Sequence, residues 1–218
     1  MMEFRALEAM AGLNQQLFNR KDGFIMSTKF FIEETTKGYE KIQLDSKLLS
    51  QRRIFLTGEI TDDTAVDFMQ MMLYLTEKNE PIDIYINSPG GNVNAGLAIY
   101  DMLQSCKNEL RMYCIGQASS MAAVLLAAGQ KGRRFILPNS RVMIHEVLLG
   151  GGIKGSATSI SRISDSIMET RDIVNGILAK HTEKTVREIN RATSFDNTMN
   201  AEQAVEFGIC DEIVNSLF

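Results

Sequence analysis

The chain has 218 residues, of which 44% are hydrophobic and 23% charged, a balance typical of one soluble globular domain with a sizeable core. A net charge of -4, without any run of five or six basic residues, argues against a nucleic-acid surface. No segment approaches the roughly 18 consecutive apolar residues of a membrane span, and the spacing of the three cysteines predicts a reducing compartment. We therefore expect a cytoplasmic protein without nucleic-acid or membrane partners.

The first 27 residues form a segment apart from the rest. Their apolar residues recur at near-helical spacing, which predicts a short amphipathic helix or a removable leader, with Met26 as an alternative start. The remaining residues, 28–218, are expected to form the folded domain. Its first part, TKFFIEE (28–34), predicts a short strand, and ETTKGYEK (34–41) predicts a polar, mobile stretch.

From residue 54 onward, strands and helices alternate along the chain. We expect strands at 54–60, 82–87, 110–115, 133–137 and 141–147, and helices at 62–78, 92–105 and 121–129. Thr61 is the expected N-cap of the first helix. A last helix at 200–207, ended by Gly208, and a strand at 210–214 complete the series. This alternation predicts an α/β layered domain whose helices cover a largely buried sheet.

An unusual segment interrupts the series. LLGGGIKGSA (148–157) is too glycine-rich for an ordinary buried strand, and a long helix is predicted from 156 to 181. The apolar residues of this helix lie on one stripe, namely Ile160, Ile163, Ile167, Ile173, Ile177 and Leu178. We expect an arm that packs on something outside its own domain, most simply another copy of the chain.

Two adjacent serines precede a run of small and apolar residues in GQASSMAA (116–123). A serine in this position either caps the helix or acts as a nucleophile, and a nucleophilic serine needs a base. Histidine is the usual base, and the chain has only two histidines. His145 ends an apolar strand, where its side chain can project into a cleft. His181 ends the long helix, where a cation compensates the helix dipole.

A carboxylate and a pair of backbone amides would complete a hydrolytic site. Asp196 lies in the loop TSFDNT, a favourable place for a catalytic group, whereas Asp83, Asp101, Asp165 and Asp172 lie within predicted strands or helices. SPGG (88–91) brings glycine backbone close to a ligand. Together with the amide of Met121 it is a candidate oxyanion hole.

These pieces, in this order, resemble the ClpP family, the proteolytic subunits of the ATP-dependent Clp proteases. The similarity covers about residues 28–214 and is carried by IFLTGEI, YINSPGG, AIYDMLQ, GQASSMAA, LPNSRVMIH, AVEFG and DEIV. It implies that Ser120 is the nucleophile, His145 the base and Asp196 the third member of the triad. It also implies that the amides of Gly91 and Met121 form the oxyanion hole.

The resemblance further implies an architecture and a set of partners. The fold would be a ClpP/crotonase-like head of ββα units with a protruding strand–helix handle at about 147–182. Handles would stack heptameric rings in pairs into a tetradecamer enclosing the active sites, and a AAA+ Clp unfoldase would feed it polypeptide substrates. The chain has no G-x-x-x-x-G-K-[ST] phosphate loop and no metal-ligand spacing, so we expect neither ATP nor any other cofactor, nor a metal, to bind.

Two other functions remain open at this stage. One is a low-activity or regulatory ring subunit that acts beside an active ClpP paralogue, and the other is a crotonase-like acyl-CoA enzyme, which uses a related fold. The sequence departs from the resembling family where Glu146 and Val147 follow the histidine in place of Gln-Pro. It also departs at Phe195, where the family carries an arginine that makes ion pairs between rings, and in KGYEK near the axial entrance.

Overall fold

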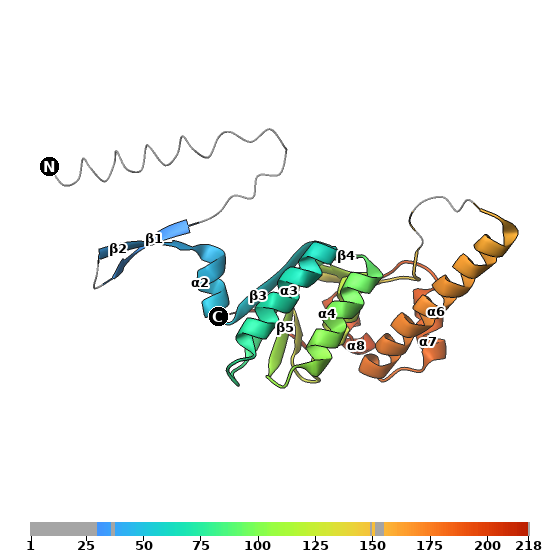
Figure 1. Ribbon diagram of the computed structural model, residues 1–218. Helices are drawn as coiled ribbons and strands as arrows, with labels where there is room; N and C mark the ends of the chain where they lie inside the picture. The colour runs from blue at the N-terminus through green and yellow to red at the C-terminus, as the bar shows by residue number, and fades with distance from the viewer. Residues whose placement is uncertain (1–29, 36–37, 149, 151–154, 218) are drawn as a thin grey trace. The chain divides into compact units, whose positions relative to one another are not determined.

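The computed structural model describes residues 30–35, 38–148, 150 and 155–217, and the chain divides into two compact units, Met1–Lys47 and Leu48–Phe218 (Figure 1). In the first unit, strands β1 (Phe30–Thr35) and β2 (Gly38–Gln43) pair as an antiparallel hairpin. Helix α2 (Leu44–Ser50) follows directly. The polar stretch expected at 34–41 is therefore largely strand, because pairing with β1 satisfies its backbone. The segment expected at 1–27 lies outside the described residues.

A seven-stranded sheet organises the second unit. Its strands are β3 (Arg53–Ile60), β4 (Ile82–Gly91), β5 (Leu110–Ser119), β6 (Arg134–Ile136), β7 (Arg141–Ile144), β8 (Asn197–Met199) and β9 (Glu212–Ile213). The order is β3-β4-β5-β6-β9, with β7 beside β5 and β8 beside β7. Every described pair is parallel except β7 with β8. The α/β class predicted from the sequence is confirmed.

Six helices of the described chain belong to this unit: α3 (Asp62–Leu75), α4 (Val93–Ser105), α5 (Met121–Ala127), α6 (Ala157–Thr182), α7 (Val186–Thr193) and α8 (Ala201–Phe207). Figure 1 shows α3 and α4 side by side along the sheet. Thr61 caps α3 as predicted, its side chain accepting a hydrogen bond from the backbone N–H of Thr64. Helix α7 was not predicted.

The two faces of the sheet differ. Ile54, Ile84 and Met112 are fully buried in the core that the sheet shares with the helices. Because side chains alternate along a strand, their neighbours lie on the opposite face. There a ladder of stacked rings, Phe55, Tyr85, Tyr113 and Phe135, runs across the strands with centroids 5.0–5.1 Å apart. Phe55 at its end is 47% exposed, so the helices cover one face rather than both.

The long helix α6 has two parts with different surroundings. Its carboxyl-terminal half buries Val174, Ile177 and Leu178 in the core, whereas Ile160 and Met168 in its amino-terminal half are 42% and 45% exposed. Figure 1 shows α7 beside the carboxyl-terminal half and the other half extending away from the sheet. The apolar stripe predicted from the sequence therefore serves the core of this unit at one end only.

A buried ion pair anchors the carboxyl end of α6. Arg134 on β6 is 1% exposed and forms an ion pair with Asp211, while its Nη1 donates hydrogen bonds to the carbonyls of Ala127 and His181, each at 3.0 Å. Asp211 Oδ2 also accepts from the backbone N–H of Gly132 at 2.8 Å. Burial alone raises the pKa of Asp211, but the hydrogen bonds and charge of Arg134 together hold it below its ordinary value of 3.8.

Substituting Asp211→Asn should lower the free energy of unfolding by about 3 kcal/mol at pH 7, because Arg134 would remain buried without a counter-charge. Because the pKa of Asp211 is lower in the folded state than its ordinary value of 3.8, its carboxylate stabilises the fold above pH 3.8. This stabilisation is lost as the pH falls through the folded-state pKa. The difference between the two proteins should therefore shrink below pH 4. Urea unfolding across pH 3–7 measures it, with Asp101→Asn on the exposed face of α4 as control. A constant difference over that range would contradict the assignment.

Candidate active site

Ser120 occupies a strained turn between β5 and α5. Its backbone has φ 54° and ψ -124°, a conformation that is rare for residues other than glycine. Its N–H donates to the carbonyl of Met143 on β7 at 2.7 Å, which holds the turn. Although Ser120 stands at the N-cap position, its side chain makes no capping hydrogen bond. The hydroxyl is thus left for a role other than capping.

The neighbouring serine has different surroundings. Ser119 is the last residue of β5 and is 8% exposed, and its Oγ lies 3.4 Å from Gln117 Oε1 on the same strand. It does not line the cavity beside Ser120. Of the two adjacent hydroxyls, only that of Ser120, which the resemblance implies is the nucleophile, belongs to a residue that lines the cavity.

The SPGG segment supports the turn from the next strand. The strand expected at 82–87 continues through this segment to Gly91, and α4 begins after Asn92. A Cβ at Gly90 would lie 2.6 Å from the Ser119 carbonyl oxygen and 2.7 Å from Ser120 Cβ, so no other side chain fits without displacement. A Cβ at Gly91, whose φ is 152°, would lie even closer to the backbone of Ile60, and Gly91 lines the cavity together with Met121.

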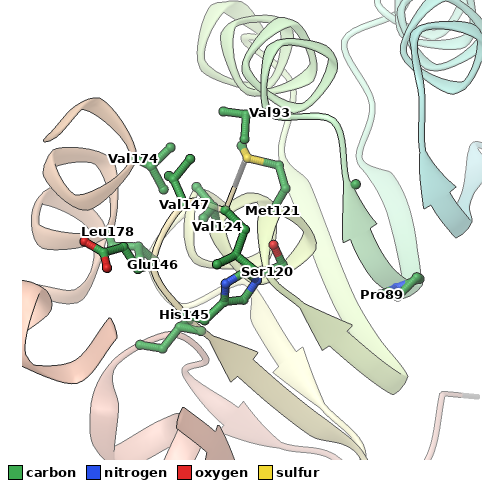
Figure 2. A pocket seen from close by; sticks show the side chains of 13 residues that line it. Pro89, Val93, Ser120, Met121, Val124, His145, Glu146, Val147, Val174 and Leu178 are labelled. Atoms are coloured by element: carbon green, nitrogen blue, oxygen red, sulfur yellow. The ribbon is translucent and has the colours of Figure 1, made fainter. Parts of the chain in front are cut away.

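His145 reaches the same cavity from β7. It directly follows the strand, is partly buried, and faces the cavity that Ser120 also lines (Figure 2). Its Nδ1 is buried and has no hydrogen-bond partner among the described residues. The structure thus brings Ser120 and His145 together at one cavity and leaves one imidazole nitrogen available for a further group.

Asp196 and His145 lie directly beyond the paired ends of β8 and β7, and the side chain of Asp196 is exposed. In the antiparallel ladder of β7 and β8, Ile144 faces Asn197, so His145 and Asp196 are the next residues in register beyond that pair. The predicted loop around Asp196 is therefore partly strand. None of the aspartates weighed in the sequence analysis as the carboxylate of a hydrolytic site, Asp196 included, lines the cavity.

The second histidine has no part in this cavity. His181 Nε2 lies 3.2 Å from the Tyr100 hydroxyl, and burial, followed by the charges of Lys180 and Arg134, lowers its pKa to about 4. His181 is therefore neutral at pH 7, which corrects the expectation of a cation that compensates the helix dipole.

The cavity itself has a volume of about 220 Å³, and most of the side chains that line it are apolar, although polar atoms form about half of its surface. Val93, Met121, Val124, Ile144, Val147, Val174 and Leu178 line it, and Glu146 is the one carboxylate among its described lining residues. Figure 2 shows the Glu146 side chain on the side of α6. Val174 and Leu178 belong to α6, whose apolar stripe we expected to serve only an external contact. Sequence spacing gave no signal for their place beside Ser120.

Two searches of the described residues concern other classes of function. No group of three or more histidine, cysteine, aspartate or glutamate side chains that could hold a metal ion occurs among them. None of the helices in this part of the chain is long and apolar enough to cross a membrane.

Comparison with known protein families identifies the class to which this fold and site belong. The model of the Clp protease family matches residues 36–216, which is most of the chain. The chain therefore belongs to the Clp protease family, as the sequence motifs predicted, and has the mixed α/β fold of that family around a mostly parallel sheet. Membership supports a ClpP-type peptidase rather than an acyl-CoA enzyme. It also implies, in general, oligomeric assembly and partnership with a Clp unfoldase.

The close approach of Gly90 to Ser120 predicts that even a methyl group at Gly90 displaces the serine. Gly90→Ala should lower the free energy of unfolding by more than Gly58→Ala, which carries the backbone strain of a positive φ without any neighbour within 4 Å. The strain alone costs about 1 to 2 kcal/mol. Denaturant unfolding of both variants measures the difference, and equal losses would show that the contact with Ser120 is unimportant.

Proposed function

We propose that the chain is a serine endopeptidase subunit in which Ser120 is the nucleophile, His145 the general base and Asp196 the residue that orients it. The observation that carries the proposal is the pairing of Ser120 and His145 at one cavity. Ser120 stands on a strained turn with a hydroxyl that caps nothing. A weak serine nucleophile requires a histidine of this kind.

The chemistry follows from this arrangement. Ser120 Oγ attacks the scissile carbonyl carbon while His145 Nε2 takes the hydroxyl proton, and the amides of Gly91 and Met121 stabilise the resulting oxyanion. His145 then gives the proton to the leaving amine. Water, activated by the same imidazole, attacks the acyl-enzyme, releases the carboxylic acid and restores Ser120. No cofactor or metal is required in any step.

Asp196 is the natural partner for His145 Nδ1, which has no hydrogen-bond partner among the described residues. The two residues lie directly beyond the last pair of the β7–β8 ladder, and a carboxylate there would fix the tautomer of the imidazole and stabilise the imidazolium. The carboxylate of Asp196 is exposed in the isolated chain. We therefore place the formation of this contact at assembly, when a neighbouring subunit covers Asp196.

The same proposal extends to the assembly. Residues 28–218 form the protease domain after a leader at 1–27, and residues of about 147–182 form a handle that stacks heptameric rings in pairs. The exposed apolar residues on the amino-terminal half of α6 support this role. A AAA+ Clp unfoldase then supplies unfolded polypeptides to the enclosed sites, which lie within a cytoplasmic, ring-shaped chamber. The chain itself contains no phosphate loop.

The direct test of the nucleophile compares the two adjacent serines. Ser120→Ala should abolish peptide hydrolysis and labelling by a fluorophosphonate probe, while native mass remains that of the unmodified protein. Ser119→Ala should retain both peptide hydrolysis and labelling by the probe, because Ser119 does not line the cavity and its hydroxyl contacts Gln117. Activity in Ser120→Ala together with its loss in Ser119→Ala would reverse the assignment.

A second function, a low-activity ring subunit beside an active paralogue, is favoured by one specific observation. His145 Nδ1 has no hydrogen-bond partner within the part of the chain that the structure describes, and Phe195, the residue before the exposed Asp196, is itself 84% exposed. Phenylalanine cannot donate the charge-assisted hydrogen bond of an arginine, which is worth roughly 1.5 to 3 kcal/mol. It buries apolar area instead, a non-directional contact that holds Asp196 less firmly.

We accordingly expect the purified chain to form single or weakly stacked rings with low peptidase activity. Phe195→Arg should shift the population toward double rings and raise activity, whereas Val186→Arg, which adds the same charge on exposed α7, should not. Mass photometry over a dilution series, with peptidase activity followed in parallel, tests both expectations. A fully active double ring of the unmodified chain that survives dilution would contradict them.

A further inference from the structure

Glu146 gives the cavity beside Ser120 an asymmetric chemistry. Among the described residues that line it, Glu146 is the one charged side chain, and those other than Ser120 and His145 carry apolar side chains or none. The volume of about 220 Å³ leaves room for one amino-acid side chain. A side chain that fits must offer apolar surface to the walls and a polar end to Glu146.

The carboxylate of Glu146 has only a loose internal partner. Its Oε1 lies 3.6 Å from Arg171 Nη1 on α6, beyond hydrogen-bond distance, and its side chain is 49% exposed. Arg171 is bound more closely to Asp172, to whose Oδ1 it donates from Nη2 at 2.8 Å and from Nε at 3.1 Å. One guanidinium thus faces two carboxylates, and the cluster of Glu146, Arg171 and Asp172 has a net negative charge.

Lysine and arginine match this cavity best. Each has a flexible apolar stem that can lie along Val124, Val174 and Leu178, and a cationic end that can reach a carboxylate. An aliphatic side chain fills the same space without using Glu146. An aspartate or glutamate is repelled, because like charges at short range are unfavourable.

We propose that Glu146 is a specificity-determining residue that favours lysine or arginine immediately before the scissile bond of the polypeptide. That side chain is adjacent to the carbonyl attacked by Ser120, and the cavity is lined by Ser120 itself. The proposal rests on the serine peptidase function above and adds the class of residue cleaved. Arg171 moderates the preference, since it neutralises part of the Glu146 charge.

Peptide reporters that differ only at this position test the proposal. Lysine and norleucine have the same four-carbon side chain and differ only in the terminal ammonium group. The ratio of their kcat/KM values therefore measures the contribution of that group. The unmodified protein should prefer lysine, and Glu146→Gln should reduce the lysine-to-norleucine ratio about three- to five-fold, the range expected for a partly exposed ion pair.

Two further variants distinguish selectivity from general damage to the site. Arg171→Gln removes the internal partner of Glu146, so the lysine-to-norleucine ratio should rise. Glu169 lies on α6 two residues before Arg171 and therefore on a different face of the helix. Glu169→Gln removes a negative charge there and should leave the lysine-to-norleucine ratio unchanged. A ratio that Glu146→Gln does not lower, or that Arg171→Gln also lowers, would overturn the proposal.

Binding measurements make the result independent of catalysis. The affinity of the two peptides for Ser120→Ala, measured by fluorescence anisotropy, should show the same lysine preference, which Glu146→Gln in that background should remove. Equal affinities would overturn the specificity proposal even if hydrolysis is observed. A lysine preference in binding without hydrolysis by the unmodified protein would support Glu146 and reject the proposed peptidase function.

Discussion

The site depends on the close contact between the backbone of Gly90 and the turn that carries Ser120. Since Gly90 has no side chain, β4 can approach the end of β5 until only a hydrogen atom fits between them. The hydrogen bond from Ser120 N–H to Met143 holds the other side of the turn. Strand β7, which supplies that carbonyl, ends at Ile144, directly before His145. The strain at Ser120 and the position of the imidazole are thus set by neighbouring strands.

The cavity wall depends on a second, more distant constraint. Arg134 binds the carbonyl of His181 at the carboxyl end of α6 and forms an ion pair with Asp211, so the end of the helix is attached to the sheet. This attachment keeps Val174 and Leu178 against the active-site cavity. The amino-terminal half of α6, without such an anchor, leaves its apolar residues exposed. One helix therefore combines a wall of the site with a surface suited to assembly.

Much of the fold follows from local patterns in the sequence. The alternation of apolar strands and capped helices between residues 54 and 129 predicts the elements that the structure shows. It does so because the spacing of apolar residues in each segment corresponds to the side chains that the segment buries in the core. Strand β2, helices α2 and α7 and strand β8 were not predicted. Their residues are largely exposed or polar, and β8 exists because it pairs with β7. Strand pairing between distant segments has no local signal.

The sequence by itself determined the chemical groups of the site and their order, since SPGG, the serine pair and the histidine after an apolar strand already indicate acyl-transfer chemistry. Only the tertiary structure decided which serine faces the cavity, because φ at Ser120 and the partner of Ser119 are set by packing. It also decided that Glu146 meets Arg171 beside that cavity. These groups are far apart along the chain, and the packing of α6 against α5 and α7 brings them together, which no residue spacing encodes.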